Sequence, residues 1–132
     1  MYQPNKAQLV ALASEAGSFA TRTSAALNMA TVSSLFLTVV LANKAGTVTF
    51  TPKIQRKLKD GTWVDYWTAA SALSANGTTT YAIGRDAIEA LTALTEVITD
   101  PVPHTIRVVL TYSGAGDGNE FDTYAELECF PW

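Results

Sequence analysis

The chain has 132 residues, 48% of them hydrophobic and 16% charged, with a net charge of −3. This size and composition favour one folded domain and exclude an intrinsically disordered chain. No apolar run is long enough to span a membrane, no cationic start precedes an apolar stretch as in a signal peptide, and the basic residues are too dispersed for a nucleic-acid footprint. We therefore expect neither a membrane nor a nucleic acid as a partner.

The N-terminal third begins with a polar segment, about residues 1–8, which we expect to be an arm. Residues 9–13 form a short apolar run that fits a helix or a strand, and a strand is favoured. Residues 18–27 alternate small and polar side chains and could pair along a sheet edge. The strongest strand pattern covers residues 33–42, because its apolar side chains occupy both faces. Such a strand is central in its sheet or covered by a neighbour.

The stretch 46–68 has the period-two pattern of a hairpin with one buried and one wet face. The apolar face of its first strand comprises Val48, Phe50, Ile54 and Leu58, and the polar face comprises Thr47, Thr49, Thr51, Lys53, Gln55, Lys57 and Lys59. Asp60 and Gly61 supply the turn. The returning strand, 63–67, places Trp63 and Trp67 on one face with Asp65. Pro52 indicates an edge position or a bulge.

After a loop over 69–78, residues 79–83 read as a short strand. Residues 86–98 are expected to form one short helix or a long ordered connection. The helical reading depends on apolar side chains at helical spacing and on Asp86 as a cap, and Pro101 and Pro103 end it. The side chains at helical spacing are Ile88, Leu91, Leu94, Thr95 and Ile98.

Two more strands are predicted at 105–112 and 121–129, each with alternating apolar and polar side chains. The first places Arg107 on its polar face. Seven to eight strands separated by turn signals predict an all-β fold, a two-sheet antiparallel sandwich that is jelly-roll-like. We expect a single β-sandwich domain over 1–132 with the N-terminal arm and a short C-terminal tail at 130–132.

No residue pattern in the chain points to catalysis, a metal or a cofactor. His104 is the single histidine and sits at the predicted start of a strand, and Cys129 is the single cysteine and reads as a small buried hydrophobe. The loop 117–122 fits a calcium site poorly, because Phe121 occupies a ligand position. The acidic row of Asp122, Glu126 and Glu128 is interpreted as a solvated or lysine-facing surface. We expect a protein that is not an enzyme.

The aromatic side chains are core residues, anchors of a protein interface or platforms for sugar rings. A role in the core or in an interface is favoured over carbohydrate binding. The candidate interface residues are Tyr2, Lys53, Gln55, Lys57, Lys59, Trp63, Trp67, Phe130 and Trp132.

Residues 48–67, with Ile54–Lys57 and Asp60–Trp63, resemble a class of small virion proteins of tailed bacteriophages, and Pro103–Val108 fits the same class. The resemblance implies a β-sandwich without catalytic residues that decorates the capsid or completes the particle. It makes a capsid decoration or cement protein the expected function. The expected partners are copies of itself and the major capsid or other virion proteins, in a virion assembled in the host cytoplasm.

Two alternatives stay open. The first is a tail tube, connector or baseplate component of the virion. The second is a carbohydrate-binding module that uses Trp63, Tyr66 or Trp67.

Overall fold

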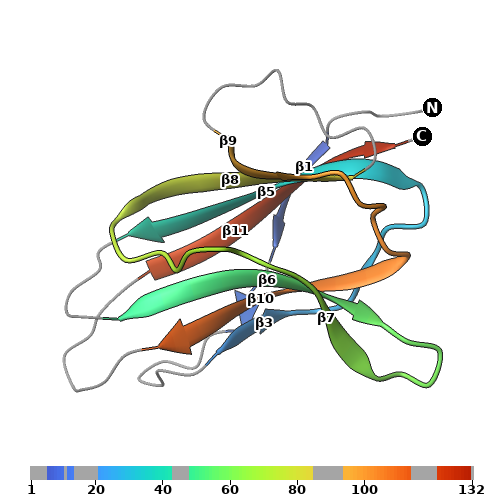
Figure 1. The fold of residues 1–132 in the computed structure, drawn as a ribbon, viewed down its shortest axis with the longest axis horizontal. Helices are drawn as coiled ribbons and strands as arrows, with labels where there is room; N and C mark the ends of the chain where they lie inside the picture. The colour runs from blue at the N-terminus through green and yellow to red at the C-terminus, as the bar shows by residue number, and fades with distance from the viewer. Residues whose placement is uncertain are drawn as a thin grey trace.

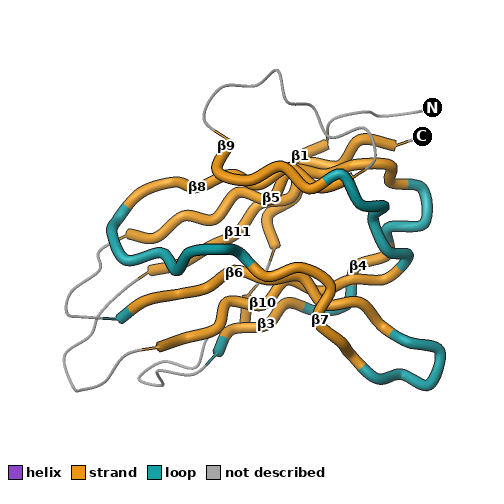
Figure 2. Tube along the Cα trace, in the orientation of Figure 1, coloured by secondary structure: helices purple, strands orange, loops and turns teal. Residues whose placement is uncertain are grey.

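The fold is all-β, as predicted. The computed structural model describes residues 6–10, 12–13, 21–42, 48–84, 94–113 and 122–131, and within these ranges it contains eleven strands and no helix (Figures 1 and 2). No helix long and apolar enough to cross a membrane is found in this part of the chain. The strands are β1 (Lys6–Val10), β2 (Leu12–Ala13), β3 (Arg22–Ser24), β4 (Leu27–Asn28), β5 (Val32–Ala42), β6 (Thr49–Lys57), β7 (Trp63–Thr68), β8 (Gly77–Gly84), β9 (Leu94–Ile98), β10 (Thr105–Ser113) and β11 (Asp122–Pro131).

The strands form two facing sheets, seen as two layers in Figure 1. One sheet has the order β1-β11-β5-β8-β9. The other has the order β2-β3-β10-β6-β7, with β4 pairing beside β3 on β10. Every pairing of named strands is antiparallel except that of β8 with β9, which is parallel. The predicted two-sheet sandwich is therefore confirmed.

Four antiparallel strand pairs are nested in the sequence. The innermost is β6–β7, followed by β5–β8, β3–β10 and β1–β11. Successive pairs alternate between the two sheets. A long hairpin rolled over itself produces this order, which is the topology of a jelly roll.

The core lies between the two sheets and is built by alternate residues of the central strands. The inner face of β5 contributes Leu35, Leu37, Val39 and Leu41, each exposed by 2% or less. From the opposite sheet, Phe50, Ile54 and the inward residues of β10 pack against it. Each fully buried side chain of this size contributes about 1.5–3 kcal/mol relative to its exposed state.

At both ends of the described chain, strands cover residues that were predicted to be an arm or a tail. β1 begins at Lys6, inside the predicted arm, and pairs with β11 along its whole length. The apolar run at 9–13 falls in β1 and β2, which lie in different sheets. β11 reaches Pro131, so residues 130–131 belong to a strand and not to a tail. The predicted edge segment supplies β3 and β4 on β10, but β3 is internal because β2 pairs on its other side.

The helical reading of 86–98 is wrong where the structure describes it. Leu94–Ile98 is strand β9, paired with β8. Ile98 packs against the core while Val97, next to it, is 36% exposed, which is the alternation of a strand. Residues 86–93 lie outside the described residues. Pairing with the parallel strand β8 makes residues 94–98 a strand, and a local sequence pattern does not reveal such a distant partner.

Pro52 does not mark an edge strand, because β6 lies between β10 and β7. Its carbonyl accepts a hydrogen bond of 2.9 Å from the Ala69 amide, just past the end of β7. In an antiparallel strand the nitrogen and carbonyl of one residue point to the same neighbour. The nitrogen of Pro52 therefore faces the end of β7, where the regular ladder has stopped.

The hairpin β6–β7 closes through a tight turn and carries a bulge. The Gly61 amide donates to the Leu58 carbonyl at 3.0 Å, and Gly61 adopts a φ of 91°. Further along, Gln55 pairs with Asp65 while Ile54 pairs with Trp67, so Tyr66 is an extra residue in β7. A bulge of this kind shifts every later side chain to the other face of the sheet.

Candidate functional site

Six outward side chains of β6, β7 and β10 form a polar cluster that includes one tryptophan. We call it the cationic face; it comprises Lys53, Gln55, Lys57, Trp63, Asp65 and Arg107. Strand register brings them together, since Gln55 lies opposite Arg107 on one side and Asp65 on the other. Lys57 lies opposite Trp63 in the same ladder.

A chain of hydrogen bonds crosses the three strands of the cationic face. Arg107 Nε donates to Gln55 Oε1 at 2.7 Å, and Gln55 Nε2 donates to Asp65 Oδ1 at 2.8 Å. Lys53 Nζ completes the chain with an ion pair to Asp65 Oδ1 at 3.2 Å. These bonds favour one arrangement of the long side chains, which reduces the ordering cost of binding.

The carboxylate of Asp65 stays charged because of these contacts. The hydrogen bond from Gln55 and then the one from Lys53 lower the pKa of Asp65 below its usual value. The Asp65 side chain remains 54% exposed and that of Lys53 21% exposed, so solvent screens the pair. An exposed pair of this kind contributes between about 0 and 1 kcal/mol to folding. The network therefore organises the surface more than it stabilises the fold.

Trp63 is half-buried and contacts two cations. The guanidinium carbon of Arg107 lies 4.5 Å from its ring centroid and Lys57 Nζ lies 5.8 Å from it. Both distances fall within the range of cation–π attraction. Because Arg107 also bonds Gln55, the indole is connected to the whole hydrogen-bonded chain.

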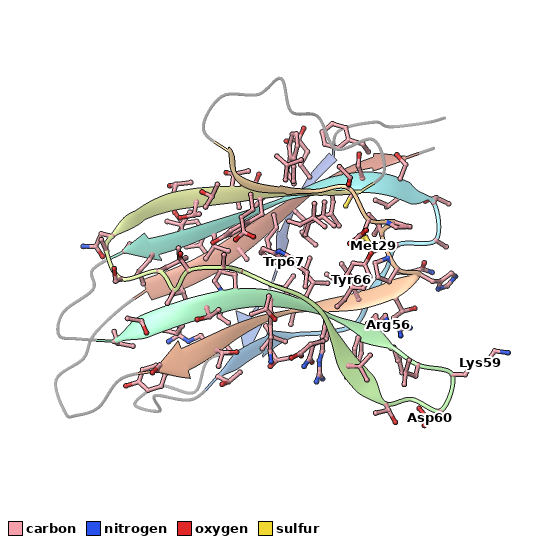
Figure 3. All side chains as sticks on the ribbon, in the orientation of Figure 1. Met29, Arg56, Lys59, Asp60, Tyr66 and Trp67 are labelled. Carbon is pink, nitrogen blue, oxygen red and sulfur yellow. The ribbon has the colours of Figure 1, made fainter. Side chains whose placement is uncertain are left out.

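Four of the predicted interface residues come together on the cationic face: Lys53, Gln55, Lys57 and Trp63. Lys59 lies in the turn beyond β6, at the tip of the hairpin beside Asp60 (Figure 3). Phe130 is on the other sheet, where its ring packs edge-on against Phe36 with centroids 5.0 Å apart. Tyr2 and Trp132 lie outside the described residues.

The prediction that Trp67 shares an outer face with Trp63 is wrong. Trp67 is 8% exposed and lies between the two sheets (Figure 3), with its ring centroid 4.8 Å from that of Tyr81. The bulge at Tyr66 causes the difference, because one extra residue turns Trp67 inward. The Tyr66 hydroxyl donates to the Pro101 carbonyl and so ties β7 to the connection before β10.

Sequence reasoning did not select Arg107 as an interface residue. Alternation on the strand 105–112 placed its side chain on the polar face, and that placement is correct. The missing information was its partner strand. Only the β10–β6 register shows that Arg107 lies opposite Gln55 and within reach of Trp63.

The cationic face as defined includes neither His104 nor Cys129, the two residues with possible chemical reactivity. His104 is exposed, with Nδ1 3.1 Å from Thr105 Oγ1. Cys129 is half-buried beside the core; burial and, to a smaller extent, Glu128 raise the pKa of its thiol. No group of three or more metal-ligating side chains exists within the described ranges. The candidate calcium loop at 117–121 lies outside them.

No family model matches the chain, and no curated protein sequence matches it. One solved structure, titled "CBM4 structure and function", aligns with 99% of this chain and 81% of its own, at 11% identity and a TM-score of 0.45.

Proposed function

We propose that this chain is a non-enzymatic structural subunit of a phage particle, a capsid decoration or cement protein that attaches through its cationic face. The observation that carries the docking role is the ordered chain Arg107–Gln55–Asp65–Lys53 beside a half-buried Trp63. Tryptophan and arginine are enriched among the residues that dominate protein interfaces. Here both are held on a rigid sheet and already oriented.

The phage context rests on the resemblance of residues 48–67 and 103–108 to virion proteins of tailed bacteriophages. The same residues contribute to the cationic face, since Gln55, Trp63 and Arg107 belong to these two stretches. Attachment to a tail tube, connector or baseplate would use the same surface. Negative-stain images of labelled particles separate a head location from a tail location.

Particle incorporation tests the proposal. Virions are purified from cells that express the chain from its own phage genome, and its copy number is measured by quantitative mass spectrometry. We expect the wild type in stoichiometric amounts and Arg107→Ala reduced by about tenfold or more, since losing such a contact costs at least about 1.4 kcal/mol. Lys59→Ala, at the hairpin tip, is the control and is expected to incorporate normally. Particles without the polypeptide would refute the proposal.

Carbohydrate binding is the second candidate, and Trp63 is the observation that favours it. The indole is half-buried next to donors and acceptors from Gln55, Asp65 and Lys57, a combination that suits a sugar ring with hydroxyls. The first candidate ranks higher because Arg107 already lies 4.5 Å from the centroid of the ring, and Trp67 is in the core. Glycan-array binding that is lost in Trp63→Ala would reverse the ranking.

A further inference from the structure

The two sheets carry opposite charge. On the outer side of strands β6, β7 and β10 lie three basic residues, Lys53, Lys57 and Arg107, and one acidic residue, Asp65. The five strands of the other sheet contain four acidic residues, three of them on β11, and one basic residue, Lys6. A sandwich has its sheets back to back, so the two charged surfaces point in opposite directions from the same core (Figure 1).

The second surface, which we call the acidic face, comprises the outward residues Tyr124, Glu126 and Glu128 of β11. Their register partners Val40, Thr38 and Phe36 of β5 lie on the same side of the sheet, and Thr80 of β8 lies beyond Thr38. In β11, the neighbouring residues Ala125 and Leu127 are fully buried, which fixes the outward direction of this set. Tyr124 is 47% exposed and Glu126 is exposed. Thr38 and Thr80 join β5 to β8 through their hydroxyls, 3.1 Å apart.

We propose that the partner of the cationic face is the acidic face of a second copy of this chain. This inference rests on the proposed function and names the occupant of the same surface. Lys57 and Arg107 on one copy meet Glu126 and Glu128 on the next, which forms charge-assisted contacts. The exposed ring of Tyr124 adds a π surface for the same cations.

The contact joins different surfaces of the two copies and is therefore heterologous. After pairing, one copy keeps a free acidic face and the other keeps a free cationic face, so association continues into a ring or an open row. A symmetric dimer would instead bring the same face of both copies into contact. Two faces of like charge repel each other, which disfavours such a dimer. The charge pattern predicts head-to-tail assembly with no closed dimer.

The contact is expected to be weak and sensitive to salt. Lys57 and Glu126 are exposed, and exposed charges are screened within about 3 Å at an ionic strength of about 1 M. Many weak contacts along a shell or a tail then add through multivalency.

Sedimentation velocity of the full chain over a range of concentration and salt tests the inference. At low salt we expect the wild type to form species that grow with concentration and dissociate at about 1 M NaCl. Lys57→Glu and Glu126→Lys should each weaken self-association by about tenfold or more, because each places like charges in contact. An equimolar mixture of the two variants should associate again, with a 1:1 heterodimer as its smallest complex, since each retains one intact face.

Two matched variants control for net charge. Lys59→Glu repeats the charge change of Lys57→Glu at the hairpin tip, and Asp100→Lys repeats that of Glu126→Lys in an exposed connection. Both should associate like the wild type, and circular dichroism melts verify that all variants fold. A wild type that stays monomeric at low salt, or a variant mixture that does not associate, would overturn the inference.

The outcome separates this inference from the proposed function. A monomeric chain that is still found in particles would mean that the cationic face binds a different virion protein. Head-to-tail assembly of a chain that is absent from particles would leave the inference standing and remove the phage role.

Discussion

The interior of the sandwich and the cationic face are built by the same strands and held by different forces. Trp63 and Trp67 stand four residues apart on β7, yet one stacks with cations at the surface and the other packs between the sheets. A single extra residue, Tyr66, separates the two environments. Residue type alone therefore does not decide whether an aromatic stabilises the fold or presents a surface; strand register does.

The two tryptophans give the largest expected difference. Trp67→Ala removes a ring that packs on Tyr81 in the core, and we expect it to lower the free energy of unfolding by about 3–5 kcal/mol. Trp63→Ala removes a half-buried ring and should cost about 1 kcal/mol or less. Urea titrations followed by circular dichroism measure both. Equal losses for the two variants would contradict the division between core and surface.

Two glycines extend the comparison to the backbone. Gly84 has a φ of 137°, and an added Cβ would lie 2.5 Å from the Ser33 carbonyl oxygen on β5. Gly61→Ala meets nothing within 4 Å and is strained only by its φ of 91°. In the same urea titrations we expect Gly84→Ala to lower the free energy of unfolding by about 2–4 kcal/mol and Gly61→Ala to lower it by about 1–2 kcal/mol. A smaller cost at Gly84 than at Gly61 would show that the strands separate easily there.

Alkaline titration examines the interior through Tyr81. Burial, with a smaller effect from Glu96, raises the pKa of Tyr81 to about 12. The unfolded chain loses this proton near pH 10, so stability should fall by about 2–3 kcal/mol between pH 10 and pH 12. Tyr81→Phe should remove that part of the decline.

At pH 7 the same variant should be as stable as the wild type or slightly more stable. The Tyr81 hydroxyl is buried without a hydrogen-bond partner among the described residues, so little is lost with it. Denaturation curves of both proteins at pH 7 and at each alkaline pH provide the check. A marked loss of stability at pH 7 would reveal a bound partner for the hydroxyl.

Acid titration examines the cationic face and gives the smallest effect. The lowered pKa of Asp65 means that its contribution to stability is present above the unfolded pKa of about 3.9 and is lost as the pH falls through the folded value. Asp65→Asn should lower the free energy of unfolding by less than about 1 kcal/mol at pH 7, and it should not change that free energy in acid. Asp100→Asn, in an exposed connection, is the control.

Local patterns were sufficient for the central strands. The apolar residues at alternate positions of 33–42 and 48–58 predict strands, because only an extended strand directs all of them into one core. Leu94–Ile98 could not be predicted in this way, since the same residues satisfy a helical spacing and their strand depends on β8. The jelly-roll order was suggested by strand number and turns, while the pairing itself was not encoded locally.

The candidate site was predicted in part for a related reason. Lys53, Gln55 and Lys57 alternate along one strand, so their shared face follows from sequence. Arg107 joins them from a strand about fifty residues away. Trp67 leaves their face through a bulge in the β6–β7 ladder; Pro52 indicated a bulge in this region, but no residue type identified Tyr66 as the extra residue. Contacts across strands and irregularities within them are set by the whole fold.

The nested strand order has a consequence for biosynthesis. β11 lies between β1 and β5, so these two strands stay unconnected until β11 has been synthesised. The hairpin β6–β7 can close early, whereas β1 waits for a partner more than one hundred residues downstream. Such long-range closure is slow, and the incomplete sheet presents open edges in the meantime. We therefore expect the pairing of β1 with β11 to be a late step of folding that follows formation of the hairpin β6–β7.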